Sequence, residues 1–114
     1  MIEPRLTSDF QISAITRLAE AEGDFAMILR KGDVTSGAIL LIGQIRGKNP
    51  VVFERYPSLD GHSGWQPVAL LVQGNEAEVT EYWQKRVARD PDLWVMELDV
   101  ASSERLNGLL LASA

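Results

Sequence analysis

The sequence predicts an α+β fold in which helices pack on a mainly antiparallel sheet of about five strands. The main observation is the run at residues 38–45, AILLIGQI, which is apolar on both of its alternating faces. Such a run is typical of a central strand that is buried on both sides. Other apolar runs of strand length are separated by glycine- and proline-containing turns, and two stretches repeat apolar residues at helical spacing. A chain of 114 residues with 46% hydrophobic residues supports one core, so we expect a single domain over residues 1–114.

The first expected element is a helix at residues 8–22. Thr7 or Ser8 is expected to cap its start, because a hydroxyl can accept from backbone amides that have no partner in the first turn. The apolar face of this helix is predicted from residues at helical spacing, namely Phe10, Ala14, Ile15 and Leu18. Gly23 suits the left-handed backbone conformation that commonly follows a helix end.

Four strands are expected next, at residues 25–30, 38–46, 51–56 and 65–72. The turn-rich segment 31–37 predicts a hairpin between the first two strands, and Gly47-Lys48-Asn49-Pro50 predicts a second turn. Pro67 has no backbone N–H to donate, so the fourth strand is expected at a sheet edge or with a bulge.

The second half of the chain predicts a helix, a strand and a short helix. Asn75 is expected to cap a helix that runs to about Asp90, with an apolar stripe of Val79, Tyr82, Trp83 and Val87. Glu81 and Lys85 stand in the favourable order for an ion pair along this helix. A fifth strand is expected at residues 93–98, and Ser102 or Ser103 is expected to cap a last helix through Leu111.

The expected element order is therefore α-β-β-β-β-α-β-(α). The first four strands are predicted to form a meander, and the helix before the fifth strand allows that strand to run parallel to a neighbour. The doubly apolar second strand favours helices on opposite faces of the sheet. Two layers with a buried homodimer face would explain the same pattern, and the sequence leaves both alternatives open.

Composition excludes several classes of chemistry. The chain has no cysteine, which excludes disulfides, thiolate metal sites and cysteine nucleophiles. The N-terminal residues MIEPRLTSDF resemble no secretory signal, and no apolar run reaches the length of a membrane span, so a cytoplasmic protein without a membrane contact is expected. The net charge of −5 disfavours nucleic acid as a partner.

Basic residues gather in the middle of the chain. Residues 30–56 carry a net charge of +3, against −3 for residues 1–29 and −5 for residues 57–114. We expect this segment to form a binding surface at the end of the sheet, and its alternative is an ordinary solvated surface. The predicted binding residues are Arg30, Lys31, Arg46, Lys48 and Arg55, with His62 and Trp65 beside them.

No catalytic or metal-binding motif is present. The sequence has no phosphate loop and no dinucleotide-binding motif, and its single histidine excludes a zinc-protease motif. Asp60, His62 and Ser63 are nearly adjacent, whereas the members of a hydrolytic triad come from separated elements. Asp90 and Asp92 fit a helix exit better than a metal site. We therefore predict no catalytic residue, metal ligand or cofactor.

Several segments resemble a family of short bacterial proteins of unknown function. They are RLAEAEGDFAMILRKGD, SGAILL and EAEVTEYWQKRVARDPDLWVMELD, and the resemblance runs from about Arg5 to Asp99. It implies a bacterial, cytoplasmic α+β domain and assigns no catalytic residue.

Taken together, these observations favour a non-enzymatic binding or adaptor domain with a protein partner. The alternative is a domain or enzyme that binds a small anionic ligand in a pocket formed by loops 32–37 and 58–64, where small residues can present backbone amides.

Overall fold

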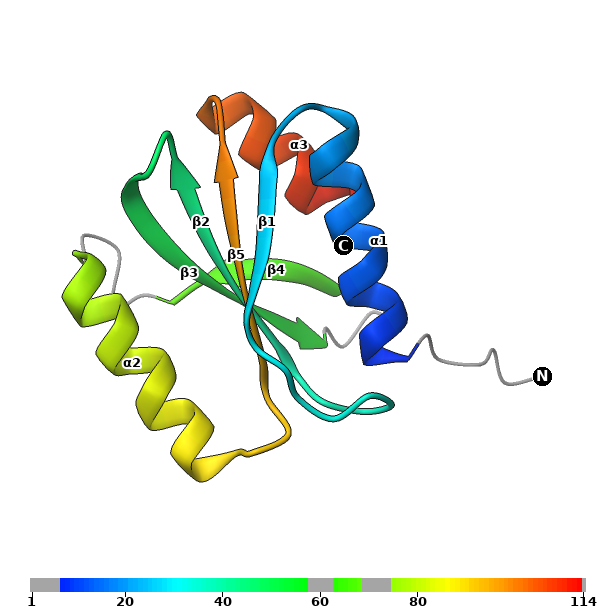
Figure 1. Ribbon diagram of the computed structural model, residues 1–114, viewed down its shortest axis with the longest axis vertical. Helices are drawn as coiled ribbons and strands as arrows, with labels where there is room; N and C mark the ends of the chain where they lie inside the picture. Colours follow the sequence, from blue (N-terminus) through cyan, green and yellow to red (C-terminus); the bar gives the residue numbers. More distant parts are fainter. Residues whose placement is uncertain (1–6, 58–62, 69–74, 114) are drawn as a thin grey trace.

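The computed structural model describes residues 7–57, 63–68 and 75–113. Within these residues the chain forms three helices and a five-stranded sheet, in the predicted order (Figure 1). The elements are α1 (Ser8–Ala21), β1 (Phe25–Arg30), β2 (Ile39–Ile45), β3 (Lys48–Pro57), β4 (Ser63–Pro67), α2 (Glu76–Arg89), β5 (Trp94–Val100) and α3 (Ser103–Ala112).

The strand order across the sheet is β1-β5-β2-β3-β4. The doubly apolar strand β2 lies in the middle, as predicted. It pairs antiparallel with β3 and parallel with β5, which confirms the parallel placement of the fifth strand. The edge position of β4, expected from Pro67, is also confirmed.

The predicted hairpin between the first two strands is wrong, and the meander is therefore incomplete. Strand β5 lies between β1 and β2 and pairs with both of them. The physical reason is burial: β5 is almost continuously apolar, and Trp94, Val95, Met96 and Leu98 are all buried. A strand of this kind loses more contacts at an edge than β1 does, so it takes the interior position.

Helices cover both faces of the sheet, which gives three layers (Figure 1). Helices α1 and α3 pack on one face and α2 packs on the other. The first core contains Ile12, Ile15, Ala19, Ile39, Leu41, Trp94, Met96, Leu98, Val100, Leu106 and Leu109. The second contains Leu40, Ile42, Val52, Val79, Leu93 and Val95.

The predicted apolar face of α1 is only partly correct. Ile12, Ile15 and Ala19 are buried, whereas Phe10 is 56% exposed and Leu18 is 39% exposed. The buried face of α1 is rotated from the predicted one and includes Ser8, which is also buried. The Ser8 hydroxyl donates to the carbonyl oxygen of Gly37 at 2.6 Å. Thr7 is the residue before the helix, but its side chain does not cap the helix as predicted.

The other helix termini follow the predictions. The side chain of Asn75 accepts from the backbone amide of Glu78 at the start of α2, and the side chain of Ser102 accepts from that of Arg105 at the start of α3. Gly23 follows α1 with a φ of 81°, a conformation that costs a glycine little. The predicted pair of Glu81 and Lys85 is present at 2.9 Å.

The two ends of the sheet differ in the segments that meet there. We call the end at which β2 and β5 finish, at Ile45 and Val100, the turn end. The end at which they begin, at Ile39 and Trp94, is the loop end, and β1 finishes there at Arg30. The turn end contains the tight turn between β2 and β3, and the loop end contains the segment between β1 and β2.

Candidate functional site

The predicted basic residues do not come together on one surface. Arg46 and Lys48 lie at the turn end, where Ile45 pairs with Lys48. Arg30 and Lys31 lie at the loop end, because Arg30 pairs with Val95 near the start of β5. The length of the sheet separates the two pairs, so they do not form one continuous basic surface.

Arg55 forms a third location, and it is held within the protein. Its guanidinium donates to the side chain of Gln11 and to the backbone carbonyl of Ser113, each at 2.5 Å. It also lies 4.3 Å from the centre of the Trp65 ring, and the Trp65 indole donates to the Ser113 hydroxyl at 3.1 Å. Burial lowers the pKa of the Arg55 guanidinium. Arg55 and Trp65 thus join β3 and β4 to the helices α1 and α3. His62, the remaining predicted binding residue, lies outside the described residues.

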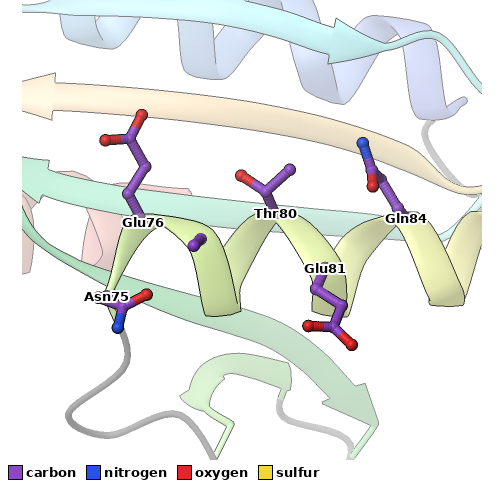
Figure 2. A pocket seen from close by; sticks show the side chains of 6 residues that line it. Asn75, Glu76, Thr80, Glu81 and Gln84 are labelled. Atoms are coloured by element: carbon purple, nitrogen blue, oxygen red, sulfur yellow. The ribbon is translucent and has the colours of Figure 1, made fainter.

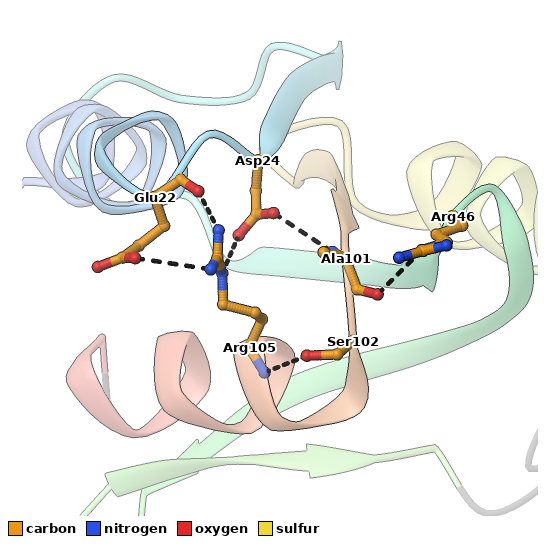
Figure 3. A network of polar contacts seen from close by, with 6 residues as sticks. All are labelled: Glu22, Asp24, Arg46, Ala101, Ser102 and Arg105. Carbon is orange, nitrogen blue, oxygen red and sulfur yellow. Dashed lines mark hydrogen bonds and ion pairs between the residues drawn. The ribbon is translucent and has the colours of Figure 1, made fainter.

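Arg46 belongs to a network of polar contacts at the turn end (Figure 3). Its Nε donates to the carbonyl oxygen of Ala101 at 3.3 Å. Beside it, Asp24 is 7% exposed and accepts from the Ala101 amide at 3.3 Å and from Arg105 Nε at 3.1 Å. Arg105 also contacts the Glu22 carboxylate at 3.7 Å. The carboxylate of Asp24 is therefore fully partnered, as a buried structural charge must be.

The loop at residues 32–37 has few amides left for an anion. The Asp33 carboxylate accepts from the backbone amides of Thr35 at 3.1 Å and of Ser36 at 2.9 Å. These bonds hold the pKa of Asp33 below its ordinary value. The Asp33 amide itself donates to the carbonyl oxygen of Asp92 at 2.9 Å. The second loop of the alternative pocket, residues 58–64, lies almost entirely outside the described residues.

A shallow depression lies on the outer surface of α2 (Figure 2). It is lined by Asn75, Glu76, Ala77, Thr80, Glu81 and Gln84. All of these residues come from α2 or its cap, so no second element among residues 7–57, 63–68 and 75–113 closes over the depression. In the described part of the chain, no group of three or more acidic or histidine side chains is arranged to hold a metal ion.

In the described part of the chain, the large apolar side chains that are exposed on a strand all belong to β1, at the edge of the sheet. Phe25 is 74% exposed, Met27 is 60% exposed and Ile28 is 47% exposed. Phe25 and Met27 are on the face that α2 only partly covers, whereas Ile28 is on the face of α1. The edge strand is therefore apolar on both faces, and we call Phe25, Met27 and Ile28 the β1 edge.

Acidic residues lie beside the β1 edge on the α2 face. Met27 pairs with Glu97 of β5, and Phe25 pairs with Asp99. On the opposite edge of β5, Glu97 pairs with Ile42 of β2. Partial burial raises the pKa of Glu97, and the nearby charges of Asp99 and Glu76 raise it further.

Comparison with known proteins supports the fold and adds a family. A family model described as "Protein of unknown function (DUF1491)" matches residues 6–107. The chain belongs to the DUF1491 family. This assignment confirms the resemblance to a family of unknown function.

Solved structures of similar proteins have the same fold. The crystal structure of a DUF1491 family protein from Caulobacter crescentus CB15 is 31% identical with a TM-score of 0.78, covering 89% of this chain and 94% of that chain. An NMR structure of a DUF1491 family protein from the same bacterium is 32% identical with a TM-score of 0.71, covering 86% and 88%. The solution structure of protein Atu0922 from A. tumefaciens, at 22% identity and a TM-score of 0.70 over 87% and 89% of the two chains, is similar in fold. No curated protein matches this chain.

The exposure of the β1 edge in this DUF1491 protein was not predicted from the sequence. The run FAMILR is apolar at both alternating positions, a pattern that predicts burial on both faces of the sheet rather than exposure. The signal that could have found it is the absence of protective residues. Edge strands commonly carry charged residues or proline, and FAMILR has none before Arg30, its last residue.

Among the residues that the structure describes, no helix of this DUF1491 protein is long and apolar enough to cross a lipid bilayer.

Proposed function

We propose that this DUF1491 protein is a non-enzymatic binding domain that takes up an extended segment of a partner protein along β1. The observation that carries the proposal is the exposure of Phe25, Met27 and Ile28 on an edge strand. An edge strand presents unpaired backbone groups, and a partner strand that joins it gains both main-chain hydrogen bonds and side-chain contacts.

The sequence of β1 suits this role because both of its faces are apolar. A partner strand would cover Phe25 and Met27 on one face and Ile28 on the other. Full burial of side chains of this size stabilises a complex by about 1.5–3 kcal/mol each. The register of β1 against β5 shifts between Ile28 and Arg30, which limits regular pairing to the first part of the strand.

The predicted basic residues support a protein-binding role only in a modified form. Arg30 ends β1, but its guanidinium donates to the carbonyl oxygen of Pro91 at 3.4 Å, and Arg46 and Lys48 lie at the other end of the sheet. Arg55 is occupied by Gln11 and Ser113. The anionic-ligand alternative has less support, since Asp33 already engages the amides of Thr35 and Ser36. We keep the cytoplasmic location that the sequence suggests.

The test uses peptides selected from a random displayed library on the purified protein. We expect selected peptides to bind in extended form and to slow the exchange of backbone amide hydrogens in β1. The variant Met27→Lys should weaken their binding by about tenfold or more, because a lysine on an edge blocks strand addition.

Leu111→Lys is the matched control, since Leu111 is 79% exposed on α3 and lies outside the sheet. It should bind the peptides as the wild type does. Failure to select any peptide would overturn the proposed function, as would peptides that bind Met27→Lys and the wild type equally well.

A further inference from the structure

We propose that the segment bound by β1 is basic on alternate residues, with lysine or arginine on the α2 face and apolar residues on the α1 face. This inference rests on the proposed function and names the chemistry of the partner. It follows from the acidic residues that lie next to the β1 edge on one face of the sheet only.

The acidic residues share one face because of the strand register. Glu97 and Asp99 are two residues apart on β5, so their side chains are on the same face. That face is the α2 face, since Val95 packs in the α2 core. Glu76, Thr80 and Gln84 point from α2 toward the side on which β5 and β1 run, whereas Glu81 points to the opposite side (Figure 2).

Among the residues that the structure describes, some acidic groups of the fold are paired with a cation, and these three carboxylates are not. Ion pairs link Glu81 to Lys85, Glu54 to Arg86, and Asp24 and Glu22 to Arg105. Within the described residues, no such pair involves the three carboxylates that we call the acidic face: Glu76, Glu97 and Asp99.

The acidic face has only partial compensation from neutral donors. Asp99 accepts from the Gly47 amide at 2.9 Å, and Glu97 interacts with the side chain of Gln44. Neither contact adds positive charge. Mutual repulsion therefore persists in the free protein, and a cation from a partner would relieve it.

Dimensions favour lysine or arginine on the bound segment. Neighbouring strands lie about 4.8 Å apart, so a strand added to β1 would lie about 10 Å from β5. Long basic side chains can cross Met27 or Phe25 with their aliphatic stems on the apolar surface and their charged groups near Glu97 or Asp99. The apolar residues of the segment would then face Ile28.

Charge also selects among other occupants of the edge. A second copy of this chain has a net charge of −5 and would bring a second acidic face toward the first. Phosphate groups of nucleic acid would meet the same repulsion. A basic segment of a different protein is the occupant that the charges favour.

The test measures the binding of three synthetic peptides of equal length. One alternates arginine with valine, and in the others glutamine or glutamate replaces every arginine. We expect the arginine peptide to bind at about 0.15 M salt at least about tenfold more tightly than the glutamine peptide, and the glutamate peptide not to bind.

Two double variants locate the charges. The double variant Glu76→Gln with Glu97→Gln should bind the arginine peptide about tenfold or more weakly than the wild type does. Glu20→Gln with Glu104→Gln changes the net charge equally at exposed sites on α1 and α3 and should change the binding by less than about twofold. Equal losses in the two variants would overturn the inference, because they would indicate general attraction to an acidic protein.

The results separate this inference from the proposed function. If the glutamine peptide binds as tightly as the arginine peptide and Met27→Lys abolishes both, the strand-binding function stands and the basic partner is wrong. If Met27→Lys binds the arginine peptide as tightly as the wild type does, the β1 edge is not the binding surface and both proposals fail.

Discussion

The indole nitrogen of Trp94 donates a hydrogen bond to the backbone carbonyl of Asp33 at 2.7 Å. This bond joins the first residue of β5 to the loop that follows β1. A second bond, from the Asp33 amide to the carbonyl oxygen of Asp92, lies beside it at 2.9 Å. The loop is therefore attached to the entry of β5 and helps to fix the strand between β1 and β2.

The close approach of this loop to Asp92 makes Gly37 difficult to replace. A Cβ at Gly37 would lie 2.1 Å from the carbonyl oxygen of Asp92, which is a backbone atom and cannot move aside alone. We expect Gly37→Ala to lower the free energy of unfolding by about 3 kcal/mol. Urea denaturation measures this loss.

Gly108 provides the control for that substitution. It lies within α3, where a Cβ would have nothing within 4 Å. Gly108→Ala should raise the free energy of unfolding by about 0.5–1 kcal/mol, because alanine is the better helix former. Equal effects of the two substitutions would show that the loop does not pack closely on Asp92.

The ion pair between Arg105 and Asp24 should contribute more to the free energy of unfolding than an exposed pair does. Asp24 is 7% exposed, so removal of its cationic partner leaves a buried charge with a single amide donor. We expect Arg105→Met to lower the free energy of unfolding by about 1–3 kcal/mol. The double variant Asp24→Asn with Arg105→Met should recover part of the loss.

Lys85→Met is the matched control, because Lys85 and Glu81 form an exposed pair along α2. Its loss should be within about 0.5 kcal/mol. Thermal or urea unfolding of the four proteins gives the comparison. A loss in Lys85→Met as large as that in Arg105→Met would contradict the role of burial.

The raised pKa of Glu97 predicts a stabilising substitution. Because the folded state binds the Glu97 proton more tightly than the unfolded state does, ionisation of Glu97 opposes folding. Glu97→Gln should therefore unfold at a higher urea concentration than the wild type at neutral pH. The difference should shrink as the pH falls through the raised pKa and vanish below the ordinary carboxyl range.

Asp33 should show the opposite dependence, which makes it the control. Its pKa is lowered by the amides of Ser36 and Thr35, so its ionised form favours folding. Asp33→Asn should unfold at a lower urea concentration than the wild type at neutral pH, and the loss should disappear as the pH falls through the lowered pKa. Parallel pH profiles for the two variants would contradict at least one of the two shifts.

The local elements could be predicted from the sequence because their causes are local. Asn75 and Ser102 cap helices by contacts within a few residues, and Gly23 ends α1 through its own backbone freedom. The central place of β2 follows from its own apolar pattern. Strand order is different, since the insertion of β5 depends on a comparison between distant segments that no local pattern contains.

The candidate site was harder to predict for the same reason. Arg30 and Arg46 are close in sequence, but the reversal of the chain places them at opposite ends of the sheet. Glu97 and Met27 are far apart in sequence and adjacent in the register. The grouping of charges along the chain therefore says little about their grouping in space.

The position of β5 between β1 and β2 also has a consequence for the order of folding. Strand β5 follows the other four strands in the sequence, so β1 and β2 cannot complete their pairing until it has been synthesised. Non-local and parallel pairings of this kind form slowly, because the entropy of a long loop is lost before the stabilising contacts can form. During that interval the apolar strand FAMILR lacks partners on both of its edges, and unpaired apolar strands of this kind are prone to aggregate.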